Sequence, residues 1–361
     1  MVTRLNSAVI GCGRMGAFTS ESLRGQVPNF WFPLSHAEAV LRHERLHLSA
    51  LCDTSAEAVA KAAKAYHVPA TYIDARKLIE EVRPQLLCIA TRTVGRADLM
   101  LDAAEMGVRA MHVEKPLCNS VSEFGRLTTL LGSGDVFATY GAVRRFMTVY
   151  RFAKGLADSG RYGPLREIRV NFGSAALYWT HAHSVDLILF AAGQRRVTGV
   201  QCRLSGAIEG ASRTEIESDP TVVSAAVYFD DGVAGIVTQS LGADLVLCCK
   251  DAEIAVRANG GRVEVYASRD GAIFPSARPF DGTLPAADAE GTFAPVSELV
   301  GCLDGEAGAI AHNAVNRRDI LEGQRILFAL VQSHLEGSRI VEPDAADPSM
   351  VIHARTGDRY A

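Results

Sequence analysis

Short apolar stretches alternate with longer segments of helical periodicity through the first third of the chain. Four of the apolar stretches have the length of β-strands: 7–10, 46–52, 86–90 and 109–113. Between them, apolar residues recur every three or four positions, which predicts helices over 15–24, 36–43, 55–66, 75–81 and 96–106. This alternation predicts a doubly wound α/β fold with a parallel sheet. Because the carboxyl ends of parallel strands share one edge, where such sheets bind ligands, residues distant in sequence are expected to meet there.

Length and composition narrow the class of protein. The chain has 361 residues, more than one hydrophobic core usually serves, so we expect two domains, 1–140 and 141–361. It has 48% hydrophobic and 22% charged residues and a net charge of −4, which is the balance of a globular enzyme. No basic run favours nucleic acid or a membrane surface as a partner.

Neither export nor a metal centre is indicated. No apolar stretch reaches the roughly twenty residues of a membrane span, and the N-terminal residues lead directly into the first strand, so we expect a cytoplasmic protein. The eight cysteines form no CxxC pair, which indicates neither a zinc site nor a disulfide framework. We therefore expect reduced thiols and no bound metal.

A glycine-rich turn follows the first predicted strand. Positions 11–16 read GCGRMG, a GxGxxG that opens a predicted helix. Gly11 is expected to permit the tight turn, Gly13 to let backbone N–H groups approach a pyrophosphate, and Gly16 to let the helix pack against the strand. Alone, the pattern is equally typical of an ordinary βα turn. Together with the next strand ends it predicts a dinucleotide site that includes Arg14 and Met15.

Two further strand ends carry polar side chains. The carboxylate of Asp53 is placed to accept hydrogen bonds from the adenosine ribose and to repel a 2′-phosphate, which favours NAD over NADP. Its long spacing from the glycines is attributed to an insertion over 24–35, whose role stays open. The alternative for Asp53 is a helix N-cap before 55–66, and both roles are compatible. Thr91 is expected at the nicotinamide ribose, although a simple turn is an equal alternative.

The fourth predicted strand ends in Glu114-Lys115-Pro116. A residue before proline is kept out of the helical region, so Lys115 is expected to stay extended at the sheet edge and to point into the ligand crevice. Hydride transfer from an alcohol requires loss of the hydroxyl proton, and desolvation beside an oxidised nicotinamide lowers the pKa of an amine toward working pH. We therefore expect Lys115 to act as acid and base. The alternative is a solvated surface lysine. It explains less of the sequence, because such a lysine requires neither a strand end nor a following proline.

With these elements the chain resembles the glucose–fructose oxidoreductase, inositol dehydrogenase and rhizopine-catabolism (Gfo/Idh/MocA) family, nearly from end to end. The resemblance rests on AVIGCGRMG at 8–16 and EKPL at 114–117. Supporting signals are VRRF at 143–146, GRYG at 160–163, HSVD at 183–186 and the segment 327–341. The Glu-Lys-Pro element combined with an upstream GxGxxG is the specific part of the match.

The resemblance implies a Rossmann domain followed by an α+β domain with an open, mostly antiparallel sheet that forms homodimers or homotetramers. Strand patterns agree with such a sheet over 165–172, 197–205, 221–229, 233–240, 252–256 and 262–267. The resemblance also implies NAD and a sugar, cyclic polyol, sugar phosphate or nucleotide sugar. The family's lysine falls on Lys115, with Glu114 beside the cofactor, and its pocket histidine falls on His183. Asp186 lies one helical turn from His183 and is expected to orient it, unless it is a surface carboxylate.

One position departs from the family pattern. Many of its dehydrogenases have an aspartate four residues before the histidine, and here that residue is Trp179. With Tyr178 and His181 it is expected to give an aromatic wall that stacks on a sugar ring. Arg144 and Asp186 are assigned to the same substrate pocket. A tryptophan that only packs the structure is an equal alternative.

Three functions fit the sequence. The first is reversible hydride transfer at a ring CH–OH or C=O carbon, with Lys115 as the principal acid and base and His183 assisting. The second, implied by the resemblance, is a glycosidase that keeps NAD bound and uses transient oxidation to eliminate a leaving group. The third is a non-catalytic dinucleotide-binding accessory protein, suggested by Trp179 and disfavoured by the retained lysine and histidine.

Overall fold

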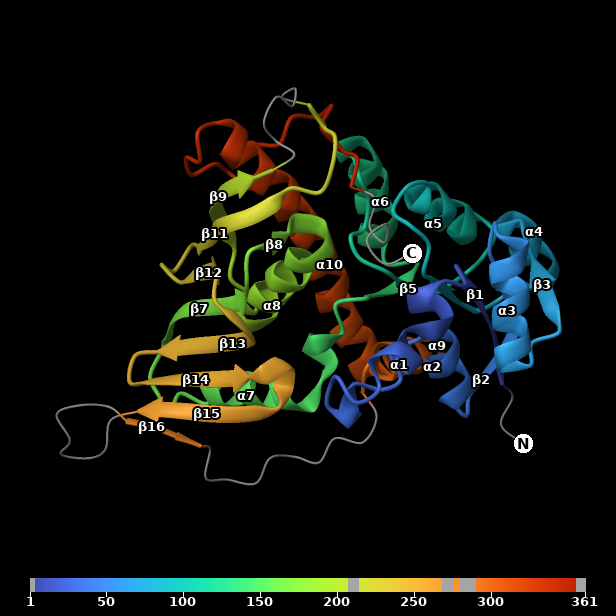
Figure 1. Cartoon of the computed structure of the whole chain (residues 1–361), viewed down its shortest axis with the longest axis horizontal. Coiled ribbons are helices and arrows are strands. Elements are labelled where there is room, and N and C mark those ends of the chain that lie inside the picture. Colours follow the sequence, from blue (N-terminus) through green and yellow to red (C-terminus); the bar gives the residue numbers. More distant parts are fainter. Residues whose placement is uncertain (1–3, 207–213, 268–275, 280–289, 355–361) are drawn as a thin grey trace. The chain divides into compact units, whose positions relative to one another are not determined.

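The computed structural model describes residues 4–206, 214–267, 276–279 and 290–354 (Figure 1). These residues cluster into two compact units. The first comprises 4–143 and 290–321, and the second comprises 144–206, 214–267, 276–279 and 322–354. The predicted division at residue 140 assigns 290–321 to the second domain, whereas the chain clusters them with the first.

The first unit is built on a six-stranded parallel sheet with the order β3-β2-β1-β4-β5-β6. Four strands confirm the predicted ones: β1 (Leu5–Ile10), β2 (Leu46–Cys52), β4 (Leu86–Ile89) and β5 (Ala110–Val113). The two edge strands, β3 (Ala70–Tyr72) and β6 (Phe137–Tyr140), are additional. They are only three and four residues long and contain threonine and tyrosine, so neither has the continuous apolar sequence of a buried parallel strand.

The helices of the first unit alternate with its strands. They are η1 (Arg14–Phe18), α1 (Thr19–Leu23), η2 (Asn29–Trp31), α2 (His36–Arg42), α3 (Ala56–Tyr66), α4 (Ala75–Val82), α5 (Arg96–Glu105), α6 (Val121–Ser133), α9 (Phe293–Leu303) and the start of α10 (Ala307–Leu335). Of these, η1 with α1, α2, α3, α4 and α5 correspond to the five predicted helices. The predicted helix 15–24 is divided into a π-helical turn, η1, and the short α1. Helix α9 packs on β5, β6 and α2, which accounts for the return of this late segment to the first unit.

The insertion over 24–35 is largely packed into the first unit. Trp31 and Phe32 are 5% and 6% exposed. The segment before α9 fixes the insertion through two backbone bonds, since Glu290 N donates to Phe30 O at 2.9 Å and Thr292 N donates to Pro33 O at 2.8 Å. The aromatic residues Trp31 and Phe32 therefore serve packing within the unit.

The second unit is built on a nine-stranded mixed sheet with the order β16-β15-β14-β13-β7-β12-β11-β8, and β9 also pairs with β11. The pairing of β12 with β7 is parallel and the other strand pairs are antiparallel. The strands are β7 (Leu165–Phe172), β8 (Ala175–Ala176), β9 (Val197–Ser205), β11 (Thr221–Phe229), β12 (Ala234–Thr238), β13 (Leu241–Cys249), β14 (Ala252–Arg257), β15 (Arg262–Ala267) and β16 (Ser276–Pro279). This confirms the predicted fold class of a Rossmann half and an α+β half. The small β10 (Glu215–Ile216) pairs separately with β17 (Val351–Ile352).

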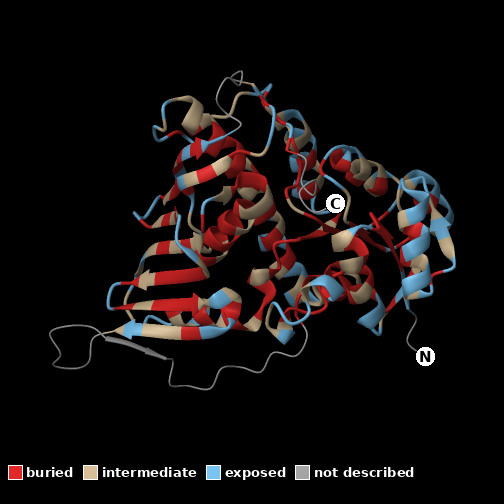
Figure 2. Ribbon diagram, in the orientation of Figure 1, coloured by how far each residue is buried: buried red, intermediate tan, exposed pale blue. Residues whose placement is uncertain are grey.

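The second unit also contains helices and short helical turns. They are η3 (Val143–Phe146), α7 (Thr148–Asp158), η4 (Leu177–His181), α8 (Ala182–Ala192), η5 (Ala258–Gly260) and the second part of α10. Helix α8 packs on β7 and β12, and the absence of a side chain at Gly235 admits Ile188, since a Cβ there would lie 2.3 Å from its Cγ2. Figure 2 shows that β13 and β14 are largely buried, whereas β15 is partly exposed.

None of the described helices is long and apolar enough to cross a membrane. All eight cysteines are unpaired thiols, and seven of them are buried. Among the described residues, no group of three or more His, Cys, Asp or Glu side chains is placed to hold a metal ion.

Candidate functional site

The glycine turn of the first unit lies against the end of the neighbouring strand. Gly11 has a φ of +94°, and a Cβ there would lie 2.6 Å from the carbonyl of Ala90. A Cβ on Gly16 would lie 1.7 Å from Gly11 O, so this close approach also requires glycine. Around Gly13, in contrast, a Cβ would meet nothing within 4 Å. The turn is therefore closed against the sheet at Gly11 and Gly16 and is open to an approaching group at Gly13.

Arg14 and Met15 begin the π-helical turn η1 and are partly exposed. Thr19 N donates to Arg14 O, and the Thr19 hydroxyl donates to the sulfur of Met15 at 3.4 Å. Both predicted cofactor residues thus lie between Gly13 and Gly16, and Thr19 of the following helix bonds to the backbone of Arg14 and to the side chain of Met15.

Asp53 joins the end of β2 to the glycine turn. Its Oδ2 accepts a 2.7 Å hydrogen bond from Cys12 N, and its Oδ1 accepts a 2.9 Å bond from Ser55 N. The N-cap of α3 is Ser55, whose hydroxyl accepts from Ala58 N, so the alternative of Asp53 as N-cap does not hold. Each carboxylate oxygen has two lone pairs, and each can accept a further bond from a ribose hydroxyl.

Thr91 follows β4 and is partly exposed. Its Oγ1 is buried and has no hydrogen-bond partner among the residues that the structure describes. Buried polar atoms are usually bonded, so this hydroxyl is suited to a polar group of a ligand. Together with the opening at Gly13, it fits the dinucleotide that the sequence predicts.

The carboxylate of Glu114, after β5, is buried, with the residue 5% exposed. Its Oε1 lies 3.1 Å from His36 Nε2, and its Oε2 accepts from Lys115 N at 3.2 Å. The carboxylate lies close to Gly141, where a Cβ would be 2.7 Å from both carboxylate oxygens. Burial alone would raise the pKa of Glu114, but the hydrogen bond from His36 and the nearby charges of His36 and Lys115 outweigh it and hold that pKa well below its usual range.

A second buried histidine completes this group of side chains. The rings of His36 and His112 lie 4.7 Å apart between centroids. His112 Nδ1 lies 3.0 Å from the hydroxyl of Thr139 on β6. Burial and the neighbouring His36 lower the pKa of His112 to about 3, so this imidazole is neutral at physiological pH.

Lys115 is partly exposed at the carboxyl edge of the first sheet. The peptide bond to Pro116 is cis, and the next helix, α6, does not begin until Val121. The lysine therefore stays outside the helix. Backbone bonds join the neighbouring strand ends in turn, since Glu114 N donates to Ile89 O, Ala90 N donates to Ile10 O and Gly11 N donates to Cys52 O. The structure thus brings the glycine turn, Asp53, Thr91 and Lys115 to one sheet edge.

His183 lies in the second unit, in the first turn of α8, and is partly exposed. His181 is 1% exposed, and its Nδ1 lies 3.0 Å from Ser184 Oγ. Burial lowers the pKa of His181 to about 4. Tyr178 is also fully buried: its hydroxyl accepts from Gln324 at 3.3 Å. Both side chains are thus buried, whereas the predicted ligand wall calls for an accessible surface.

Trp179 is partly exposed on η4, so of the three predicted wall residues it alone keeps a surface. The carboxylate of Asp219 holds this turn, because Tyr178 N donates to Oδ1 at 2.8 Å and Trp179 N donates to Oδ2 at 2.9 Å. Asp219 takes the place of a side-chain cap for η4, a contact that the local sequence does not reveal.

The other predicted substrate residues are held by partners within the second unit. Asp186 forms an ion pair with Arg145 at 2.9 Å, and both side chains are about 5% exposed or less. Arg144 donates two bonds to the Asn259 side-chain oxygen, at 2.9 and 2.8 Å, and its guanidinium lies 4.7 Å from the ring centroid of Phe172. The sequence predicts neither Arg145 nor Asn259 as a partner.

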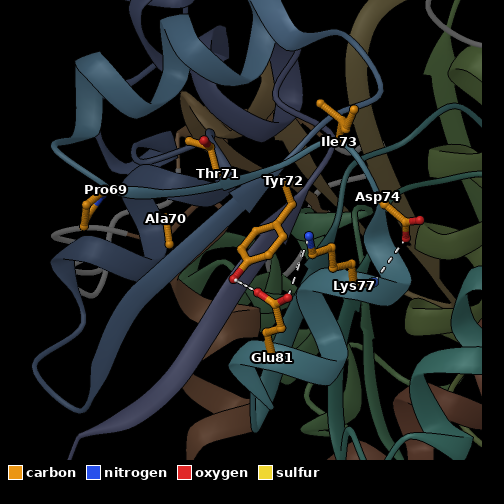
Figure 3. Close-up of a pocket in the computed structure, with 8 residues that line it drawn as sticks. All are labelled: Pro69, Ala70, Thr71, Tyr72, Ile73, Asp74, Lys77 and Glu81. Carbon is orange, nitrogen blue, oxygen red and sulfur yellow. Dashed lines mark hydrogen bonds and ion pairs between the residues drawn. The ribbon is translucent and has the colours of Figure 1, made fainter.

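A separate hollow of about 450 Å³ lies at the outer edge of the first sheet (Figure 3). It is lined by residues 69–74, Lys77 and Glu81. Its polar side chains already bond to one another, since Glu81 accepts from Tyr72 at 3.0 Å and lies 3.9 Å from Lys77. No predicted site residue lines it, so it is not part of the candidate site.

Comparisons with known proteins agree with this geometry. No curated protein matches the sequence. An oxidoreductase domain protein from Kribbella flavida is 21% identical, with a TM-score of 0.68 over 94% of this chain and 99% of its own. The WlbA dehydrogenase from Bordetella pertussis, solved with NADH and UDP-GlcNAcA, is 17% identical, with a TM-score of 0.68 over 94% of this chain and 98% of its own. An inositol dehydrogenase homologue from Azotobacter vinelandii, solved with NADH and myo-inositol, is 16% identical, with a TM-score of 0.73 over 95% of this chain and 98% of its own.

At these identities the solved structures show a shared fold. The sequence comparison adds the family, because residues 5–141 match the model of the Gfo/Idh/MocA oxidoreductase family, described as an NAD-binding Rossmann fold. Residues 5–141 of this chain therefore match the NAD-binding Rossmann fold of the Gfo/Idh/MocA oxidoreductase family.

Proposed function

We propose that this protein transfers a hydride between NAD and a ring CH–OH or C=O carbon of a carbohydrate-like substrate. The observation that supports it is the position of Lys115, beside the buried Glu114 at the sheet edge that also holds the glycine turn. Two proteins of the same fold were solved with UDP-GlcNAcA and with myo-inositol. A sugar, cyclic polyol, sugar phosphate or nucleotide sugar is the corresponding substrate class.

The cofactor would be held by the first unit. The glycine turn, with Arg14 and Met15, would receive the pyrophosphate at the open side of Gly13. Asp53 would accept from the adenosine ribose and repel a 2′-phosphate, which favours NAD over NADP. Thr91 and Glu114 would lie toward the nicotinamide end. When bound, the nicotinamide gives or accepts the hydride.

Lys115 would exchange a proton with the reacting oxygen of the substrate. In oxidation the amine takes the hydroxyl proton, and in reduction the ammonium returns one to the carbonyl oxygen. The ionised Glu114 beside it supplies a fixed negative charge. His183 would assist by hydrogen bonding to the same oxygen, and Trp179, Arg144 and Asp186 would shape or support the substrate pocket.

Lys115→Ala tests the proposal. With a panel of sugars, polyols and their phosphates or nucleotides, the wild type should change the absorbance of the reduced nicotinamide, and the variant should lose that change but still bind NADH. Lys154→Ala is the matched control, because Lys154 is also a partly buried lysine, paired with Asp158. Equal turnover by wild type and Lys115→Ala would refute the role of the lysine. Product formation with tightly retained NAD and no net absorbance change would indicate the glycosidase instead.

We also propose that the open face of the second sheet forms a homodimer or homotetramer. The strands place Glu167 and Arg169 on the face opposite α8, where they pair at 3.1 Å, and Arg169 also pairs with Glu253. The eight unpaired thiols fit a reducing compartment such as the cytoplasm. Light scattering of the purified protein measures the number of copies, and a monomer would exclude this assembly.

A further inference from the structure

A buried arginine lies between the ends of β4 and β5. Arg96, the first residue of α5, is 1% exposed. A guanidinium keeps its charge in proteins and offers five N–H donors in a rigid fork. A buried one must therefore find several acceptors. The acceptors of Arg96 are three backbone carbonyls, those of Thr91, Glu114 and Pro116.

The three carbonyls belong to the two loops that hold candidate site residues. Nη1 of Arg96 donates to Glu114 O at 2.6 Å and also to Pro116 O, the carbonyls immediately before and after Lys115. Nη2 donates to the carbonyl of Thr91 on the neighbouring strand end. One planar group thus fixes the backbone on both sides of Lys115 and ties it to Thr91.

A structural role alone would not require these particular partners. An arginine at the start of a helix could bond to any carbonyl near it, but all three bonds of Arg96 go to the loops after β4 and β5. The negative charge of Glu114 also stabilises the buried positive charge of Arg96. Lysine cannot reproduce the arrangement, since its ammonium is a point charge on a flexible stem, whereas the guanidinium fork bonds several acceptors in one plane.

We propose that Arg96 is a positioning residue for the reaction, which sets the backbone of Lys115 relative to Thr91 and the nicotinamide end of the cofactor. This inference rests on the proposed function. Arg96 is itself too buried to touch a ligand, so its effect passes through the two loops. A misplacement of about 1 Å at a reacting group can cost roughly 100-fold in rate, so the predicted consequence is on kcat.

The test compares Arg96→Lys with Arg317→Lys. Arg317 is a matched control in the first unit, because its Nη1 also donates to two backbone carbonyls, Leu131 O at 2.9 Å and Val136 O at 3.3 Å. These lie before β6, at the amino edge of the sheet and away from Lys115. For each variant we would measure thermal unfolding, the Kd of NADH from nicotinamide fluorescence, and kcat and KM for the substrate that the panel identifies.

Arg96→Lys should lower kcat about 100-fold, weaken NADH binding and leave the KM of the substrate unchanged. Arg317→Lys should lower the unfolding temperature about as much as Arg96→Lys does, but it should leave kcat unchanged. Arg96→Gln, which keeps two N–H donors and buries no charge, is the second variant and should show the same loss of kcat.

Each other outcome decides against the inference. If the wild type turns over substrate and a folded Arg96→Lys or Arg96→Gln keeps its kcat, Arg96 does not position the lysine. If both Arg96 variants fail to fold while Arg317→Lys folds, its role is structural only. If the wild type neither binds NADH nor turns over any substrate, the proposed function itself is refuted. This result comes from the wild type alone and is therefore distinct from a failure of the inference about Arg96.

Discussion

Replacing Glu114 by glutamine tests the buried carboxylate next to Lys115. The wild-type side chain accepts two bonds, one from His36 and one from Lys115 N. Glutamine keeps its shape, and its one oxygen can retain the contact with His36. The amide NH2 then faces Lys115 N–H, so one hydrogen bond to a charged acceptor is lost.

The size of the effect follows from that single bond. A hydrogen bond to a charged group contributes about 1.5–3 kcal/mol, and about 1 kcal/mol shifts the Tm of a domain of this size by roughly 2–4 °C. Glu114→Gln should therefore lower the Tm of the first unit by about 3–12 °C at neutral pH. NADH should bind more weakly, because the loop after β5 loses part of its support.

The pH dependence gives a second measurement of the same group. The folded state holds the pKa of Glu114 below its ordinary value of 4.5. The stability that this shift provides is complete above pH 4.5 and is lost as the pH falls through the range below it. The Tm difference between wild type and Glu114→Gln should be constant from neutral pH down to about 5 and should narrow in more acid solution.

Calorimetry of both proteins from neutral to acid pH is the assay. Glu81→Gln is the control, because Glu81 is half exposed and its pairing with Lys77 at 3.9 Å is weak. If Glu114→Gln lowers the Tm no more than Glu81→Gln, or if the difference grows in acid, the carboxylate is not the ionised, buried group described here.

Two further substitutions test other parts of the structure. Gly16→Ala should abolish NADH binding, because its Cβ would lie 1.7 Å from Gly11 O. The control is Gly13→Ala, whose Cβ meets nothing within 4 Å and which should leave the fold intact. Fluorescence titration measures NADH binding and circular dichroism measures folding, and normal binding by Gly16→Ala would contradict the geometry. Asp186→Asn should destabilise the second unit by about 3–5 kcal/mol, since it leaves the buried charge of Arg145 uncompensated. Denaturant unfolding measures this loss, and the variant Asp158→Asn, at an exposed carboxylate, is the control. Equal free energies of unfolding for the two variants would contradict the prediction.

The central strands of the first sheet can be predicted from the sequence because parallel strands buried on both faces are continuously apolar. The edge strands β3 and β6 lack that signal. The return of α9 to the first unit cannot be predicted, because the apolar periodicity of 293–303 shows that a helix has a buried face without showing which sheet covers it. The fold class can therefore be predicted from local patterns, whereas the unit to which a late segment such as α9 belongs cannot.

The same division applies to the candidate site. Strand topology alone brings the residues of the glycine turn, Asp53, Thr91 and Lys115 to one edge. Arg96 and His36 escape prediction because no local sequence pattern connects Arg96 to its three backbone carbonyls or His36 to the buried carboxylate of Glu114. The burial of Tyr178 and His181 also escapes prediction, because η4 is a π-helical turn and ordinary helical spacing does not show which of its side chains face the core.

The bond between Asp53 and Cys12 N has a consequence for any redesign of cofactor preference. A substitution that removes the carboxylate to admit a 2′-phosphate also removes the acceptor that braces the glycine turn at 2.7 Å. Under the proposed role of Asp53, cofactor specificity and the rigidity of the turn depend on the same side chain. A variant that accepts NADP must supply a replacement acceptor for that backbone N–H, or the gain at the phosphate will be offset by a looser binding loop.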